Sequence, residues 1–234
     1  MDDREVSPPG AALANGMTVD SLDAHDGYAL AAGAALVPTA LAMLTLEHSK
    51  AEVPGSELLT TLGFGYEAAL RAGIALHAIA CDCHTSAAWN ALGCAAVTAR
   101  RLRLDSEQTR HALGIAEYLG PRSQMMRCID FPTMLKDGSG WGVMTGVSAA
   151  LLAQKGFSGA PAVTIESQGV ENTWDTLGED WLIFDQYFKP YAACRWVQQA
   201  IEAALVLQRT CGLSPEAVKR VQGSTFEKAI RLDL

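Results

Sequence analysis

The chain has 234 residues and a formal net charge of −8, which argues against nucleic acid as its main partner, because neutralising phosphates requires a basic surface. Hydrophobic residues make up 49% of the sequence, enough for the core of one large domain or of a large and a small one. No charge-free stretch is long enough to span a bilayer, and the acidic start MDDREVSPPG does not resemble a signal peptide, so we expect a cytoplasmic protein with no membrane partner.

The first 156 residues predict an all-helical domain. Residues 1–10 read as a poorly anchored tail, and the ordered core is expected over residues 11–156. Asp105 and Gln108 have the spacing of a capping box, Ser56 is a candidate N-cap, and Gly120 and Gly156 suit helix ends. Helices rich in Ala and Gly, typical of close packing, are expected over 34–47, 56–77, 85–102, 106–119 and 139–155.

The character of the sequence changes at Gly156, and residues 157–234 predict a smaller α/β domain. Residues 157–180 are rich in Gly, Pro, Ser, Asn and Asp, which is typical of loops. Strands are candidates over 162–166, 181–188 and 221–226, and a helix over 190–211. The fold class we expect is therefore mostly α, with a large helical domain and a small α/β domain.

Cationic residues gather in the loop that joins two of the predicted helices. Arg122, Arg127 and Lys136 precede the glycine-rich helix start Asp137-Gly138-Ser139-Gly140. Free N–H groups and the positive end of a helix favour a carboxylate or phosphate there. An ordinary basic surface loop is the alternative, and local chemistry alone favours it. Lys189 and Arg195 form a second cation pair at a helix start, with a solvated face as the alternative.

Several other residues are candidates for acid–base chemistry or for metal binding. Asp23, His25 and Asp26 suit either role, although turn and capping chemistry explains them equally well. His84 precedes a helix and could contact substrate or cap that helix. The spacing of the run Cys81-Asp82-Cys83-His84 is too tight for a usual zinc ligand set, so we expect no metal and no cofactor.

Taken together, five segments in one order resemble the MmgE/PrpD family, which includes 2-methylcitrate dehydratase, cis-aconitate decarboxylase and iminodisuccinate epimerase. They are ALANGMTVDSLDAHDGYALAAG, LLTTLGFGYEAALRAG, CDCHTSAAWNALGCAAVTARRLRLDSEQTRHALGIAEYLGPRSQMMR, PTMLKDGSGWG and FKPYAACRWVQQAIEAAL. The resemblance implies a helical domain with an α/β lid, usually in a homodimer, and a metal-free site for di- or tricarboxylates between the two domains. The family's site positions match Asp23, Asp26, His84, Lys136 and Lys189, and Cys194 stands where some members have a histidine.

The sequence departs from the family pattern in two respects. Gly33 runs directly into Ala34, where the family usually has a His-Pro-Gly or His-Pro-Ser turn that contributes to the site. Family members are also considerably longer, so the opening helices and the rest of the lid are expected to be missing.

The resemblance implies a hydro-lyase that abstracts a proton next to a carboxylate and then expels water. His84, with an ordinary histidine pKa of about 6.5, is the acid–base candidate, and Asp23 or Asp26 would orient it or handle the departing hydroxyl. Lys136 and Lys189 are candidate carboxylate clamps, together with Arg122, Arg127 and Arg195. The alternatives are an epimerase or isomerase, a decarboxylase, or a degenerate member without catalysis.

Overall fold

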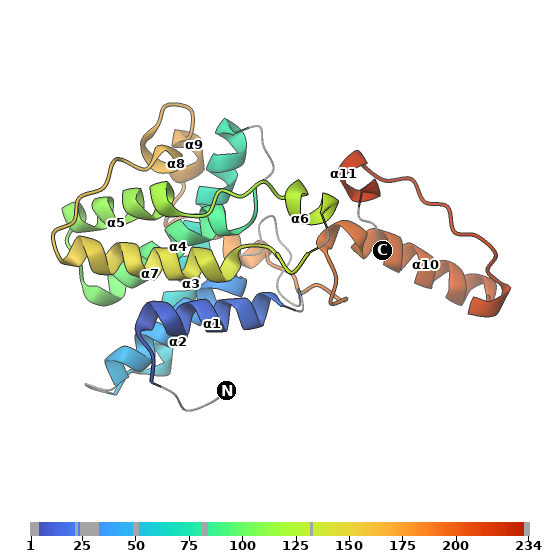
Figure 1. Ribbon diagram of the computed structural model, residues 1–234, viewed down its shortest axis with the longest axis horizontal. Helices are drawn as coiled ribbons and strands as arrows, with labels where there is room; N and C mark the ends of the chain where they lie inside the picture. Colours follow the sequence, from blue (N-terminus) through green and yellow to red (C-terminus); the bar gives the residue numbers. More distant parts are fainter. Residues whose placement is uncertain are drawn as a thin grey trace.

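The computed structural model describes residues 5–21, 23, 33–48, 52–80, 84–131 and 133–231 (Figure 1). In these parts of the chain the regular structure is helical, and β pairing is limited to two isolated bridges. The prediction of a mostly α fold is confirmed. The helices are α1 (Pro8–Asp20), α2 (Gly33–His48), α3 (Gly55–Ile79), α4 (Ala87–Leu102), α5 (Ser106–Leu119), α6 (Met126–Asp130), α7 (Ser139–Gln154), α8 (Val163–Glu166), α9 (Glu171–Trp174), α10 (Arg195–Cys211) and α11 (Glu227–Ile230), with 3₁₀ turns η1 (Leu182–Asp185) and η2 (Pro215–Ala217).

Helix α4 is the centre of the helical body. Every residue from Ala87 to Ala99 is buried, because the helix is covered on its sides by α2, α3, α5 and α7. Helix α1 lies against α7 and α2, so it completes the packing on the far side of α7 (Figure 1). A helix that is apolar or small on all faces can be stable only in such a surrounding.

Small residues allow the helix axes of the body to approach closely. A Cβ atom added to Gly146 of α7 would lie 2.4 Å from the carbonyl oxygen of Ala91 in α4. One added to Gly65 of α3 would lie 2.4 Å from Leu36 Cδ1 of α2. The same atom at Gly63 would meet nothing within 4 Å, so only some of the glycines in α3 serve the close packing that the sequence predicts.

Local sequence features determine several helix ends. The capping box at α5 is present: Asp105 accepts a hydrogen bond from the Gln108 N–H at 2.8 Å, and the Gln108 side chain accepts one from Asp105 N–H at 3.3 Å. Ser56 does not cap α3, because the helix already begins at Gly55 after Pro54. Residues 7–10 belong to a capped helix and not to a tail as predicted, since Ser7 caps α1 and the helix starts at Pro8.

The three strand predictions are wrong. Within residues 162–166 the chain forms helix α8 from Val163 onward, because the Glu117 carboxylate accepts hydrogen bonds from Val163 N–H at 2.6 Å and Thr164 N–H at 3.0 Å. A carboxylate at the first N–H groups stabilises a helical turn over an extended one. Residues 181–188 contain η1, and residues 221–226 are extended and exposed without a paired strand. The described residues after 156 thus contain no sheet, and a separate lid domain there stays a prediction.

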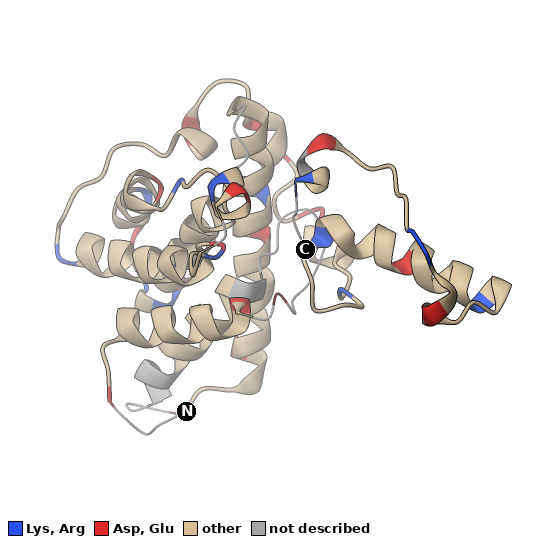
Figure 2. Cartoon of the chain, turned by 45° about the vertical axis from the view of Figure 1, so that its right-hand side comes forward, with Lys and Arg blue, Asp and Glu red and all other residues tan. Residues whose placement is uncertain are grey.

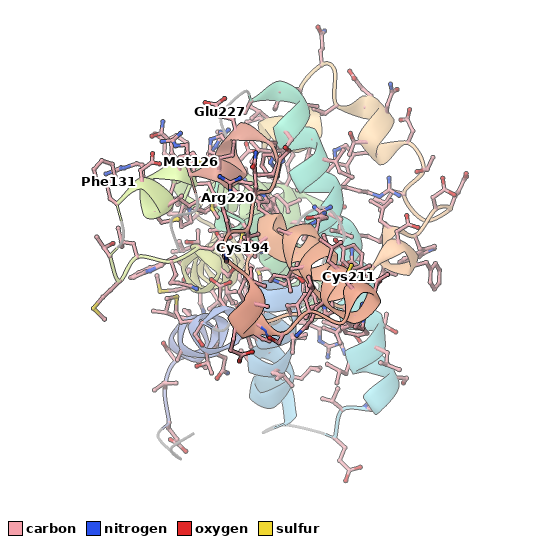
Figure 3. The ribbon with its side chains drawn as sticks, turned by 90° about the vertical axis from the view of Figure 1, so that its right-hand side faces the viewer. Met126, Phe131, Cys194, Cys211, Arg220 and Glu227 are labelled. Carbon is pink, nitrogen blue, oxygen red and sulfur yellow. The ribbon has the colours of Figure 1, made fainter. Side chains whose placement is uncertain are left out.

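The segment that follows α7 packs back onto the body before the chain leaves it. Ala162 and Val170 are buried, and Leu182 packs against the core cluster that includes Leu36 and Leu70. Helix α10 then extends away from the body, with Cys194 at its near end and Cys211 at its far end (Figures 1 and 3). None of the residues of α10 is buried.

Lys and Arg positions are interspersed with Asp and Glu positions along the chain, as the blue and red segments of Figure 2 show. Each helix in the described part of the chain is too short or too polar to cross a lipid bilayer.

Candidate active site

An ion pair joins the end of α1 to the segment before α10. Lys189 Nζ lies 2.8 Å from Asp23 Oδ1, and it also donates a hydrogen bond to the Ala193 carbonyl at 3.2 Å. The Lys189 side chain is 1% exposed and that of Asp23 is 27% exposed, so the ammonium is shielded from water. Asp23 has a φ of 52°, in the left-handed region that a non-glycine residue rarely occupies, although Asp tolerates it better than most. The fold therefore holds this carboxylate in an unusual backbone conformation beside a buried cation.

A second carboxyl group, that of Asp137, lies near this ion pair. Its Oδ1 accepts hydrogen bonds from Ser86 N–H at 2.8 Å and from Gly138 N–H at 2.9 Å. Burial raises the pKa of Asp137, and the negative charge of Asp23 acts in the same direction. The folded protein thus binds this proton more tightly than the unfolded chain does. That contribution to stability is present below the ordinary carboxyl pKa and is lost as the pH rises through the raised pKa.

The Asp137 contacts change the interpretation of the glycine-rich motif. The sequence predicts an anion site where free N–H groups open α7. In the structure the Asp137 carboxyl group accepts a hydrogen bond from Gly138 N–H at the start of α7. It also accepts one from Ser86 N–H at the start of α4, where Ser86 is the N-cap residue. The Ser86 and Ser139 hydroxyl oxygens, 3.0 Å apart, join the two helix starts further.

His84 lies near Asp137 through Ser86, which follows His84 by two positions and binds the Asp137 carboxyl group. It forms an isolated antiparallel bridge with Gln124, and the neighbouring Thr85 N–H donates to the Ser123 carbonyl at 2.9 Å. His84 is half-buried as a residue, and its Nδ1 atom is buried.

Two cysteines show that α6 and the start of α10 meet at the same place. Burial raises the pKa of the Cys194 thiol, and the charges of Asp23 and Asp137 raise it further. Burial also raises the pKa of Cys128 in α6, which lies within electrostatic reach of Asp137, Lys136 and Cys194. Figure 3 shows Met126 of α6 and Cys194 on the same side of the body.

The structure brings some of the predicted site residues together and leaves others apart. Asp23 pairs with Lys189, and Asp137 lies within electrostatic reach of Asp23. Lys136 precedes Asp137 in the chain, and His84 stands two residues before Ser86, which binds Asp137. We call Asp23, His84, Lys136, Asp137 and Lys189 the carboxyl–lysine cluster. Lys136 is exposed, as are the clamp candidates Arg122, Arg127 and Arg195. Asp26, His25, Cys81 and Cys83 lie outside the described residues.

Asp137 is the cluster residue that the sequence reasoning missed. It was treated as part of a helix start and not as a carboxyl group with its own role. The available clue was an acidic residue directly beside Lys136, inside a motif otherwise suited to binding an anion. The pairing of Asp23 with Lys189 could not be obtained from local pattern, because the two residues are far apart in the sequence.

These features define a mostly helical protein in which a shielded ammonium group and two carboxyl groups from distant parts of the chain lie near one another. The chain belongs to the MmgE/PrpD family: the family model described as MmgE/PrpD N-terminal domain matches residues 1–176. No curated protein matches the sequence significantly. Membership places the protein, at the level of the family, among dehydratases and related enzymes. The match includes four of the five cluster residues, and Lys189 follows it.

Proposed function

We propose that the protein is a hydro-lyase that removes water from a small hydroxy di- or tricarboxylate, using side chains alone. The observation that carries the proposal is the buried Lys189–Asp23 ion pair beside Asp137, whose pKa is raised by burial. A shielded cation and a carboxyl group with a raised pKa are two components that this reaction needs and that water supplies poorly.

Substrate binding would use the positive charges around the cluster. Asp23 holds the Lys189 ammonium in position, and a substrate carboxylate would share that ammonium with Asp23. Because the Lys189 side chain is 1% exposed, its attraction for a carboxylate is weakened less by solvent than that of a surface lysine. The exposed Lys136, Arg122, Arg127 and Arg195 would bind the remaining carboxylates of the substrate.

The chemistry would begin at the carbon next to the bound carboxylate. His84 takes the proton from that carbon, and the electron pair moves into the carboxylate to form an enediolate, which the lysine stabilises. The pair then forms the carbon–carbon double bond while the carbon–oxygen bond breaks. The hydroxyl group leaves as water with a proton from Asp137. Proton transfer from His84 to Asp137, directly or through solvent, restores both groups.

Asp137 suits the role of acid for a physical reason. Both of its backbone hydrogen bonds go to Oδ1, so the acid form would carry its proton on Oδ2. The raised pKa keeps this carboxyl protonated to a higher pH than an exposed aspartate.

A panel of hydroxy di- and tricarboxylates, followed by the ultraviolet absorbance of the alkene product, tests the proposal. We expect at least one substrate to be dehydrated. Lys136→Ala should lower kcat/KM about 10-fold or more, because losing a hydrogen bond to a charged group typically costs about 1.5–3 kcal/mol. Lys155→Ala is the matched control, because Lys155 is an exposed lysine at the other end of α7 and should have no effect. No turnover of any compound by the folded protein would refute the hydro-lyase assignment, and full activity of Lys136→Ala would refute the role of Lys136.

We also propose that the protein acts in the cytoplasm as a homodimer, without nucleic acid, membrane or cofactor. Sedimentation equilibrium would show a dimer, and a monomer at all accessible concentrations would contradict this part of the proposal.

A further inference from the structure

A buried ion pair on α3 is separate from the carboxyl–lysine cluster. Arg71 Nε lies 3.3 Å from Glu67 Oε2, one helical turn away, and the two side chains are 3% and 1% exposed. Removing two charges from water is costly, and packed apolar side chains of similar size often give equal or greater stability. Both side chains also form hydrogen bonds to a distant part of the chain.

Arg71 binds the main chain of a distant segment, residues 173–183, which we call the strap. Its guanidinium donates to the Thr173 carbonyl at 2.5 Å and to the Asp180 carbonyl at 2.7 Å, acceptors 102 and 109 positions later in the chain. It also donates to Thr176, at 3.2 Å to the hydroxyl and 3.4 Å to the carbonyl. The planar fork of five donors suits this task, because an irregular segment leaves several carbonyls without partners of its own.

Glu67 binds the other end of the strap. Its Oε1 accepts a hydrogen bond from Ile183 N–H at 3.0 Å, so the two side chains hold the strap from Thr173 to Ile183. Leu182, beside that last contact, packs against the core cluster of the body. Together these contacts fix a stretch that contains only short helical turns, α9 and η1.

The strap leads directly to the lysine of the carboxyl–lysine cluster. Lys189 follows Ile183 after a short connection and is then held by Asp23 at 2.8 Å. If the strap were released, the short connection could not by itself keep the ammonium in its buried position, because ordering each backbone residue costs about 1–2 kcal/mol. The contacts at Thr173, Thr176, Asp180 and Ile183 supply that order from the rigid helix α3.

We propose that Glu67 and Arg71 are positioning residues for Lys189, acting through the strap. Their role in catalysis rests on the proposed function of Lys189, whereas their role in holding Lys189 does not. Neither residue touches the carboxyl–lysine cluster in the described contacts. We predict that weakening the contacts of the strap makes the Lys189 ammonium more accessible to solvent, although both Lys189 and Asp23 are still present.

The experiment labels lysines with acetic anhydride and quantifies each site by peptide mass spectrometry. In Arg71→Lys the new ammonium still pairs with Glu67, so no buried charge is left alone, but it cannot reach all the strap carbonyls. We expect the labelling of Lys189 to rise about tenfold relative to the exposed Lys155, because the loss of several hydrogen bonds promotes local opening. In an active enzyme kcat should fall more than KM rises.

A second Arg–Glu pair provides the matched control. Arg110 and Glu166 join α5 to α8 at 2.7 Å, but they lie at the surface and do not bind the strap. Arg110→Lys should leave the labelling of Lys189 unchanged. Thr176→Val is a milder test, because it removes one acceptor of Arg71 and leaves the Glu67–Arg71 pair intact.

The outcomes separate this inference from the proposed function. If Lys189 labelling in folded Arg71→Lys stays within about twofold of wild type, the pair serves global stability alone and the inference is overturned. If that variant does not fold, Thr176→Val decides by the same criterion. Raised labelling in a protein that dehydrates no substrate would support the positioning of Lys189 and count against the hydro-lyase.

Discussion

The sharpest prediction concerns the ion pair between Lys189 and Asp23. Lys189→Met removes the ammonium but keeps most of the side-chain volume, so little cavity is left. Breaking a buried pair by removing one partner typically costs about 3–5 kcal/mol. Asp23 is 27% exposed and can recover part of its hydration, which reduces the cost to about 2–3 kcal/mol. For a chain of this length the melting temperature should fall by about 5–10 °C.

A double-mutant cycle with Asp23→Asn measures the pair itself. Each single variant leaves one charge without its partner, whereas the double variant leaves none, so we expect it to regain at least about 1 kcal/mol relative to additive behaviour. Urea unfolding followed by circular dichroism gives the four free energies of unfolding. A coupling energy below about 0.5 kcal/mol would refute the reasoning, because the two residues would then act independently in solution.

The remaining predictions concern Asp137 and two glycines. Asp137→Asn keeps the acceptor of both backbone hydrogen bonds and removes the carboxyl group whose pKa is raised. Thermal melts should show this variant more stable than wild type at about pH 8 and no more stable at about pH 4. Its dehydratase activity should be lost. Equal stability differences at both pH values would contradict the expected pH dependence. Gly146→Ala should destabilise the protein by at least about 1–3 kcal/mol in urea unfolding, because its Cβ would lie 2.4 Å from the Ala91 carbonyl oxygen. Gly63→Ala, with open space around it, should stabilise α3 by about 0.5–1 kcal/mol, and a loss of stability there would contradict the packing described.

The helical body could be predicted from sequence because its helices carry their own local information. The capping box at Asp105 and the apolar, Ala-rich stretch from Ala87 to Ala99 specify α5 and α4 before any tertiary contact is considered. The strand expected over residues 162–166 failed for the opposite reason. The β-branched residues of that stretch favour a strand, but Glu117 reaches the first N–H groups from α5 and favours a turn of helix.

The candidate site could be predicted only in part. Local chemistry and the family resemblance both point to His84, Lys136 and Lys189, but neither shows which side chains meet. Local chemistry left a solvated face open as the alternative for Lys189, whereas its side chain is 1% exposed. That burial depends on Asp23, on the Ala193 carbonyl and on the strap, all of which come together through the tertiary fold.

The most direct test of the central claim follows the fate of the substrate's C–H bond. Proton NMR in D₂O, with the protein and a panel of hydroxy di- and tricarboxylates, detects proton abstraction next to a carboxylate even when little water is lost. We predict that wild type replaces or removes that proton in at least one compound, and that His84→Gln, folded to the same extent, does so far more slowly. Unchanged proton signals for every compound, or equal rates in His84→Gln, would contradict the account.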